Sequence, residues 1–347
     1  MAIGPIPSAA NVGNVLTAQT IEYDRELIPN LKGETDAFMA MAVRRNQGKG
    51  SGINRTFFMY NELGPDIAAV VDGVVGSPEF VSQVPLAAQV AEWGNFANFS
   101  AMSVYAAVDD LVGNTGIELG YQAGQSISDL YSETLDNGTA LDSAINVTPG
   151  TQGSAAITLA NVYSMKQSLV AIGVQPCKHG KYVLACSPNT VGDFRNGTTV
   201  NNSVIDFWKY TREGQDKFEK FGSATQKEVL ELPGTGIEIR QTPFVKQTAN
   251  FQSTGLIAFR NYLAGEYALI AVWLDVPGDV DLGDGDWRAI ECGVVTDAPS
   301  SVVDPTATIG AWCYYRFHQT VSLVPIPAGI TSNTQRYRIY DAVPVLQ

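Results

Sequence analysis

The sequence predicts an α+β fold built around one very long amphipathic helix. Between residues 100 and 138 apolar side chains recur mostly in steps of three or four, as they do on one face of a helix. At ~1.5 Å per residue this helix would be a rod of roughly 50 Å, far longer than the average helix of a globular domain. Strand-like segments lie on both sides of it, which favours a mixed fold. The apolar stripe consists of Val104, Val108, Leu111, Leu119, Ala123, Ile127, Leu130 and Leu135.

The ends of the long helix carry recognisable signals. Ser100 or Ser103 can cap its start, and Gly138 stands where a left-handed residue would end it. A solitary rod of this kind is more typical of a structural subunit than of a catalyst.

The segments before the helix predict extended chain without a core of its own. Residues 1–40 are small and polar with scattered prolines, which predicts an arm. Residues 56–60 and 80–86, in a region rich in Gly, Val, Phe and Pro, predict two strands of a long excursion. A lone hairpin is marginally stable in water, so this excursion is expected to need a partner surface.

The segments after the helix predict a mixed module followed by returning strands. A polar linker over 138–154 leads to a second helix that opens at Ile157-Thr158-Leu159 and ends at Gly173. Residues 182–186 predict a buried strand, and Ser187-Pro188 predicts the N-cap and first residue of a short helix. The remaining predicted segments are a charged helix at 204–221, a hairpin of 227–232 with 237–245, and strands at 256–259, 268–274, 309–317, 320–325 and 336–343.

Composition predicts a folded protein of a reducing compartment. The chain has 347 residues, of which 45% are hydrophobic, so a substantial core can form. No apolar run approaches the ~20 residues that cross a bilayer. The first residues do not look like an export signal, so the chain is expected to remain in a cytoplasm. The cysteines lack metal-like spacing and predict buried thiols; they are Cys177, Cys186, Cys292 and Cys313.

The charge balance argues against a protein that grips nucleic acid. The net charge is −13, from 35 acidic and 22 basic residues. Binding to phosphate backbones requires concentrated Lys and Arg, which this chain does not have. Acidic residues gather between 275 and 304. An acidic surface beside DNA repels it without binding it, which suits a container.

Catalytic motifs are weak. With 2 histidines in the chain, most acid–base and zinc schemes lack residues. Cys177 and His179 leave open a cytoplasmic hydrolase-like enzyme, which would be a compact monomer with a deep pocket. Residues 173–182 miss the phosphate-loop pattern, because Gln175 and Tyr182 stand where a glycine and a metal-binding hydroxyl are needed. We therefore predict no catalytic residue and no cofactor.

An acidic loop at 279–286 resembles a calcium loop. Its third ligand and its glycine each come one place too late for an EF-hand, which favours a solvated loop over a loosely held cation. We predict no metal site there. The alternative that this loop keeps open is a decoration or adhesin-type binding protein with metal-dependent stability.

Three glycines inside the long helix require an explanation, because each costs ~1 kcal/mol relative to alanine. Gly116, Gly120 and Gly124 allow either close packing against a sheet or a rod that bends between assembly states. Acidic neighbours such as Asp109 and Glu118 exclude a membrane dimerisation face.

Two blocks of sequence resemble a known family. The first is Gln89-Val90-Ala91-Glu92-Trp93-Gly94-Asn95-Phe96 with Ser100, Asp109, Leu119-Gly120-Tyr121-Gln122-Ala123 and Asp129-Leu130. The second is Ile157-Thr158-Leu159-Ala160-Asn161-Val162 with Gly180-Lys181-Tyr182-Val183-Leu184-Ala185-Cys186-Ser187-Pro188 and Asp193-Phe194. Both are similar to signature blocks of tailed-bacteriophage major capsid proteins of the N-four-like podophage type. The resemblance covers roughly residues 30–245.

The resemblance implies the Hong Kong 97-type capsid fold. Under that fold the chain divides into an N-terminal arm (1–40), an extended hairpin loop (41–98), a spine helix of the peripheral domain (99–138) and an axial domain (139–255). Residues 256–347 would return as strands that complete the peripheral domain, with the acidic loop near 279–286.

The function implied is that of a major capsid protein, a structural protein of the virion and not an enzyme. It would assemble in the host cytoplasm into hexamers and pentamers of an icosahedral head enclosing double-stranded DNA. Its partners would be copies of itself, scaffold and portal proteins and possibly decoration proteins, with no membrane. The interface candidates at the hairpin are three cations suited to salt bridges and three aromatic residues suited to burial by a neighbour: Arg44, Arg45, Lys49, Phe57, Phe58 and Tyr60.

Overall fold

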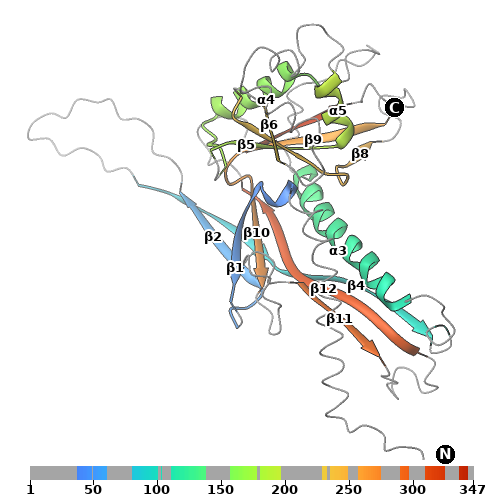
Figure 1. Cartoon of the computed structure of the whole chain (residues 1–347). Coiled ribbons are helices and arrows are strands. Elements are labelled where there is room, and N and C mark those ends of the chain that lie inside the picture. The colour runs from blue at the N-terminus through green and yellow to red at the C-terminus, as the bar shows by residue number, and fades with distance from the viewer. Residues whose placement is uncertain are drawn as a thin grey trace, which may run out of the picture.

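The structure is a computed structural model in which two β-sheets are joined by one long helix (Figure 1). It describes residues 37–48, 50–60, 80–100, 103, 111–137, 157–177, 180–196, 229–232, 235–248, 257–274, 290–296, 309–324 and 336–342. We call the sheet that contains β12 the lower sheet and the sheet that contains β5 the upper sheet.

The lower sheet is organised around one long strand, β12 (Ile309–Leu323). On one edge β12 pairs with β4 (Ala91–Ser100), and on the other with β11 (Ile290–Thr296) and then β10 (Leu269–Leu274). β1 (Ala42–Gln47) adds a parallel strand to the free edge of β10. Segments from the start, middle and end of the chain therefore meet in this sheet.

The long helix α3 (Leu111–Asp136) covers one face of the lower sheet. The predicted apolar stripe is confirmed where the structure describes it, because Leu119, Ala123, Ile127 and Leu135 are buried. Residues 104–110 lie outside the described residues, whereas the predicted cap is present: the backbone N–H of Ser103 donates to Ser100 Oγ at 3.1 Å. Facing the helix are the odd-numbered positions of β12: Cys313, Tyr315, Phe317, Gln319 and Val321.

The helix glycines lie on its buried side. Gly116, Gly120 and Gly124 are all buried, and β12 side chains reach the helix beside them. Tyr315 Oη lies 3.2 Å from Ser126 Oγ, and Cys313 Sγ lies 3.8 Å from the Val112 carbonyl oxygen. This geometry supports the close-packing interpretation, while bending of the rod stays a prediction.

The upper sheet has the strand order β13-β9-β5-β7-β6, with β8 paired to β9. Its strands are β13 (Tyr337–Ala342), β9 (Ala258–Ala264), β5 (Tyr182–Cys186), β7 (Ile237–Gln241), β6 (Val229–Leu232) and β8 (Gln247–Thr248). The helices α4 (Leu159–Ala171) and α5 (Pro188–Asn196) accompany it, as predicted, and Thr158 caps α4 by accepting from the Asn161 N–H. The β6–β7 hairpin is also confirmed.

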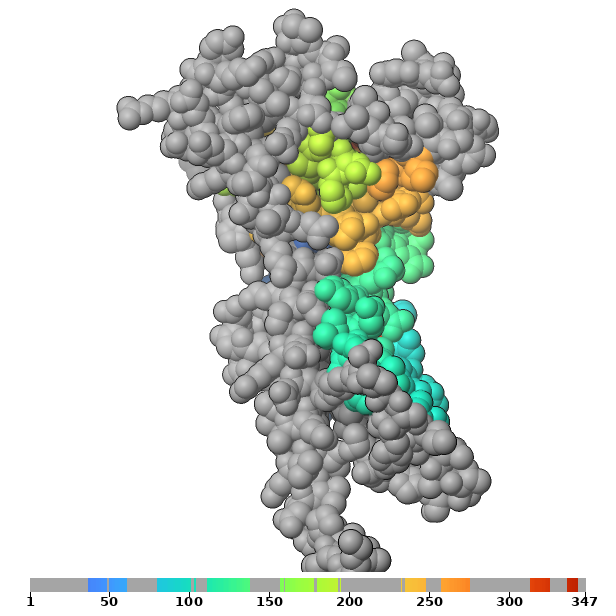
Figure 2. Space-filling view, turned by 45° about the vertical axis from the view of Figure 1, so that its right-hand side comes forward, coloured from blue at the N-terminus to red at the C-terminus, as the bar shows by residue number. Residues whose placement is uncertain are grey.

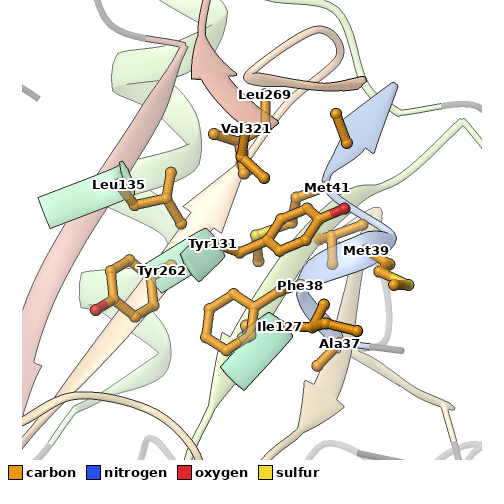
Figure 3. Packing of buried hydrophobic residues seen from close by; sticks show 14 of the residues in the cluster. Ala37, Phe38, Met39, Met41, Ile127, Tyr131, Leu135, Tyr262, Leu269 and Val321 are labelled. Carbon is orange, nitrogen blue, oxygen red and sulfur yellow. The ribbon is translucent and has the colours of Figure 1, made fainter. Parts of the chain in front are cut away.

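One hydrophobic core spans the two sheets and α3. Phe38, Met39 and Met41 are fully buried in it, together with Tyr131 of α3 and Tyr262 of the upper sheet (Figure 3). The Phe38 and Tyr262 rings meet edge to face, 5.6 Å between centroids. Residues 37–41 therefore belong to the core, although the sequence placed 37–40 in an arm; residues 1–36 lie outside the described residues.

Three strand predictions need correction. The segments 309–317 and 320–325 form one strand of 15 residues, β12. The break was predicted at the polar pair His318-Gln319, but the Gln319 side chain is buried and donates to Tyr131 Oη at 2.7 Å. β11 was not predicted at all. β1 was assigned to the excursion, yet it pairs with β10 in the lower sheet.

Candidate assembly interface

The predicted hairpin is present as a separate two-stranded sheet. β2 (Asn54–Tyr60) pairs antiparallel with β3 (Gln83–Gln89). Along β2 the exposure alternates, with Arg55, Phe57 and Met59 half-buried and the residues between them exposed. The hairpin therefore has an inner face, toward the body of the chain, and an outer face, toward solvent.

The inner face packs on the side of the lower sheet opposite α3. Phe57, Met59 and Leu86 contact a small cluster of buried residues from β3, β10 and the ends of neighbouring strands. That cluster consists of Ala88, Val90, Ile270, Val272 and Val324. Arg55 lies over the Phe57 ring at 5.4 Å and donates to the Asn46 carbonyl oxygen at 2.5 Å. The root of the hairpin is thus fixed to its own chain.

The outer face is uncharged and exposed, and it carries two large aromatic residues. Phe58 is 58% exposed and Tyr60 is 59% exposed, and their cross-strand partners are Pro85 and Gln83. Within β2 and β3, Arg55 is the single charged residue, and it lies on the inner face. Two large exposed aromatic residues next to each other on an uncharged face are typical of an interaction surface.

The predicted candidates do not form one group. Phe58 and Tyr60 share the outer face, whereas Phe57 lies on the opposite face and packs within the chain, because side chains alternate along a strand. Arg44 is half-buried, and its Nη2 donates to Met39 Sδ at 3.3 Å. Arg45 is exposed on β1, and Lys49 lies outside the described residues.

Further exposed apolar residues lie in or next to β2 and β3, and the sequence did not single them out. Phe80 is 86% exposed, and Ile53, Val81 and Val84 are also exposed. The alternation of residues 80–86 predicted a strand. The pattern of a single strand does not show which of its two faces other parts of the chain cover.

The segment 92–96 of β4 is held by contacts on both faces of the lower sheet. On the α3 side Trp93 Nε1 donates to the Gln319 carbonyl oxygen at 3.1 Å, and Asn95 Nδ2 donates to Gln122 Oε1 at 3.0 Å. At Gly94 a Cβ would lie 2.5 Å from the Tyr315 carbonyl oxygen, so β4 approaches β12 more closely than any side chain permits.

The opposite side of β4 carries an ionic cluster and an aromatic residue. Glu92 Oε1 lies 3.7 Å from Arg316 Nη1 and 3.6 Å from His318 Nε2. Phe96 is 62% exposed beside them. Phe96 is a further candidate interface residue that sequence reasoning missed, although it stands in the block that carries the family resemblance.

The side of α3 that is exposed to solvent is acidic, unlike the uncharged outer face of the hairpin. Figure 2 shows this side, in teal, directly below residues of the upper sheet in yellow and orange. A cleft of about 400 Å³ lies between α3 and residues 243–247, lined by Asp129 and Glu133 among others. Burial, and then the charge of Glu133, raise the pKa of the Asp129 carboxyl. The helix between Leu111 and Asp136 contains no Lys or Arg, so its surface is acidic.

The residues of the hydrolase alternative do not form a reactive site in the described part of the chain. Cys177 is buried, and burial followed by the charges of Glu238 and Glu266 raises the pKa of its thiol to about 11. A thiol with such a pKa is a poor nucleophile at neutral pH. His179 lies outside the described residues.

The described residues contain no group of three or more His, Cys, Asp or Glu side chains placed to hold a metal ion. The acidic loop at 279–286 lies outside them. None of the described helices combines the length and the apolar character needed to span a bilayer.

Comparison with known proteins identifies the fold. No family profile and no curated protein matches the sequence. Among solved structures, the capsid asymmetric unit of Cyanophage Pam1 is similar with a TM-score of 0.58 at 12% identity, over 86% of this chain and 91% of that one. The capsid of Ralstonia phage GP4 gives a TM-score of 0.56 at 13% identity, over 88% and 87% of the two chains. The mature capsid of bacteriophage PhiM1 gives 0.51 at 10% identity, over 89% and 87%.

These likenesses cover most of this chain and most of each chain that it is compared with. They come from phages of several hosts, so the narrower N-four-like resemblance stays a prediction. The predicted fold class is confirmed: the chain has the Hong Kong 97-type fold of phage capsid subunits.

Proposed function

We propose that this chain is a major capsid protein, which assembles with itself into hexamers and pentamers of an icosahedral phage head around double-stranded DNA. The observation that carries the proposal is the pair of exposed aromatic residues, Phe58 and Tyr60, on the uncharged outer face of the β2–β3 hairpin, in a chain with a capsid fold. A surface of this kind leaves Phe58 and Tyr60 in water until a second molecule covers it.

The energetics favour assembly over an isolated chain. Burying each exposed aromatic side chain contributes about 1.5–3 kcal/mol before the entropic cost of association. Several such residues per copy, repeated around a closed ring, give a stable shell from contacts that are weak one at a time.

The surface charge fits a container. The acidic side of α3 and the net charge of −13 disfavour tight binding to DNA, so the genome would be enclosed without sequence-specific contacts. The protein would reside in the virion after assembly in the host cytoplasm. Its partners would include scaffold and portal proteins and possibly decoration proteins. Its role would be structural and not enzymatic.

The domain division is part of the same proposal. Residues 1–36 would be the arm, because residues 37–41 lie in the core. The extended loop, predicted over 41–98, would be the part around β2–β3, because β1 and β4 pair within the lower sheet. Residues 99–138 would be the spine and 139–255 the axial domain. Of the strands in 256–347, β10, β11 and β12 would complete the peripheral domain, whereas β9 and β13 pair with β5 in the upper sheet and would belong to the axial domain. Among the cations at the hairpin base, Arg45 and Lys49 remain interface candidates, whereas Arg44 is engaged with Met39.

Electron microscopy of the expressed chain, alone and with its phage's scaffold, tests the proposal. Wild-type protein is expected to form closed shells, and the Phe58→Asp variant is expected to remain unassembled, with an unchanged melting temperature. Tyr121→Asp is the matched control, because Tyr121 is 43% exposed on α3, far along the chain from the hairpin. Normal shells from Phe58→Asp would refute the role of the outer face, and a wild-type chain that never assembles would refute the function.

A further inference from the structure

The hairpin β2–β3 is joined to β1 by a link that is rich in glycine. Between the end of β1 and the start of β2, every second residue is a glycine: Gly48, Gly50 and Gly52. Gly50 and Gly52 have left-handed φ angles of 86° and 80°, and a Cβ built on either would meet no atom within 4 Å. Such a link, taken alone, would let the hairpin swing, because glycine restricts the backbone less than any other residue does.

A buried glutamine at the end of β1 holds this link. The Gln47 side chain is buried, and its Nε2 donates to two carbonyl oxygens of the link, that of Ser51 at 3.2 Å and that of Gly52 at 2.6 Å. Gln47 Oε1 is also buried, and it has no hydrogen-bond partner among the described residues. A buried polar atom without a partner is unfavourable, so packing alone does not account for a glutamine at this position. What the glutamine adds is the pair of bonds that fixes the link.

Two further hydrogen bonds fix the first residues of the hairpin. Arg55 Nη1 donates to the Asn46 carbonyl oxygen of β1 at 2.5 Å, while its guanidinium lies over the Phe57 ring, 5.4 Å from the centroid. The Val90 N–H, between β3 and β4, donates to the Ile53 carbonyl oxygen at 2.8 Å. Because β1 and β4 are both strands of the lower sheet, these bonds attach the hairpin to that sheet at two places.

The apolar contact between the hairpin and the body weakens away from this root. Along the inner face of β3, from the root outward, Ala88 is buried, Leu86 is half-buried and Val84 is exposed. The hairpin projects past the β1 and β10 edge of the lower sheet (Figure 1). Its direction is therefore set where it starts, by the contacts of the root.

We infer that Gln47 and Arg55 are positioning residues, which hold the hairpin in one direction in the unassembled chain and so prepare it for assembly. The inference rests on the proposed function and adds how the chain controls its exposed outer face. A hairpin that swings about the glycine link has to be ordered at the moment of association, which weakens each contact. A hairpin that is already held in the competent direction avoids this cost.

Holding the root does not make the whole hairpin rigid. A two-stranded ladder is marginally stable in water, so β2 and β3 open locally and exchange amide hydrogens while the root stays in place. The bonds from Gln47 and Arg55 are made by side chains, so each can be removed without touching the outer face that carries Phe58 and Tyr60.

Distances between two spin labels in the unassembled chain test the inference. We would attach the labels to p-acetylphenylalanine at position 83, at the outer end of β3, and at position 121 on α3, and measure the distance distribution by pulsed electron paramagnetic resonance. The wild-type chain is expected to give one narrow distribution, and Arg55→Ala a distribution about twice as broad. Arg55→Lys, which keeps a cation at this place, is expected to recover most of the lost sharpness. An Arg55→Ala distribution as narrow as that of the wild type overturns the inference.

Two further variants complete the distance measurement. Lys246→Ala is the matched control, because it also removes one cation, at the end of α3, and it is expected to keep the wild-type width. Gln47→Met covers the case in which Arg55→Ala does not fold. It keeps an unbranched side chain and removes both bonds to the link, so the same broadening is expected. A wild-type width in folded Gln47→Met overturns the inference as well.

Particle yield separates the inference from the proposed function. Arg55→Ala is expected to melt at the wild-type temperature and to give about tenfold fewer particles, because its hairpin must be ordered during association. A normal yield from a variant whose distance distribution has broadened overturns the role of the two residues in assembly. If the wild-type chain gives no particles under any condition, the proposed function itself fails, while the distances still decide whether the root is held.

Discussion

Arg260 Nη1 donates to Asp136 Oδ1 at 2.8 Å and thereby joins the last residue of α3 to the upper sheet. Asp136 is 4% exposed, and Lys246 Nζ lies 2.8 Å from its second oxygen. Arg260 in turn holds Asp341 of β13, with Nε 2.9 Å from Oδ1. The helix α3 and the upper sheet therefore share an ion network as well as a core.

Removing the Asp136 charge is expected to destabilise the chain. In Asp136→Asn the half-buried Arg260 loses the more buried of its two carboxylates. Breaking a buried pair costs about 3–5 kcal/mol. We expect a loss near the lower end of this range, because Asp341 still pairs with Arg260. The free energy of urea unfolding is the measurement. Lys246→Ala is the control, expected to cost less than about 1 kcal/mol because Lys246 is 51% exposed. Equal losses in the two variants would contradict this account of the joint.

Gly94 is expected to tolerate no side chain. A Cβ at that position would lie 2.5 Å from the Tyr315 carbonyl oxygen and 3.0 Å from Arg316 Cα, both backbone atoms that the sheet fixes. Gly94→Ala should therefore lower the unfolding free energy by about 1–3 kcal/mol. Gly192→Ala in α5 is the matched control, since its Cβ would meet no atom within 4 Å. That control is expected to stabilise the chain by about 0.5–1 kcal/mol.

The buried hydrogen bond between Gln319 and Tyr131 is expected to show strong coupling. Gln319→Met removes the donor to Tyr131 Oη, which should cost about 1–3 kcal/mol because a buried polar group loses its partner. Tyr131→Phe alone leaves the Gln319 amide without that acceptor and should cost a similar amount. The double variant is expected to cost less than the sum. Strict additivity of the two losses in a double-mutant cycle would show that the bond contributes nothing.

Stability is expected to fall in alkali. Burial, and then the charge of Asp136, raise the pKa of Tyr337 to about 12, and burial also raises the pKa values of Tyr131 and Tyr262. A raised folded-state pKa means that the native chain holds the phenolic proton more tightly than the unfolded chain does. This stability is complete below the unfolded pKa of about 10 and is lost as the pH rises from there toward about 12.

Urea midpoints measured at a series of alkaline pH values check this expectation. Tyr337→Phe should make the decline shallower, because it removes one of the groups that titrate. A wild-type midpoint that stays constant between about pH 10 and 12 would contradict it.

Local patterns in the sequence were sufficient for much of the fold. The apolar spacing of α3, the Thr158 cap of α4 and the buried run of β5 each depend on residues close together in the chain. The polar residue Gln319 does not break β12 as its polarity predicted, because it bonds to Tyr131, which lies 188 positions away in the sequence. β1 was missed for the same reason, since only its pairing with β10 defines it.

The candidate surface was predicted in part. Phe58 and Tyr60 were recognised as aromatic residues of a strand without a core, but the face toward which each points depends on pairing with β3 and on the packing at β10. The sequence therefore grouped Phe57 with these two residues, whereas the structure places it on the opposite face of the hairpin. Nothing in the sequence marked Phe96 as exposed, because the pattern of a strand is the same whether an aromatic residue in it is exposed or buried.

Hydrogen–deuterium exchange of the hairpin, before and after assembly, tests the central claim most directly. We predict fast exchange at residues 54–60 and 83–89 in the unassembled chain, and protection of the same residues in purified shells. A chain that stays monomeric at every concentration, with these residues already protected, would contradict the account.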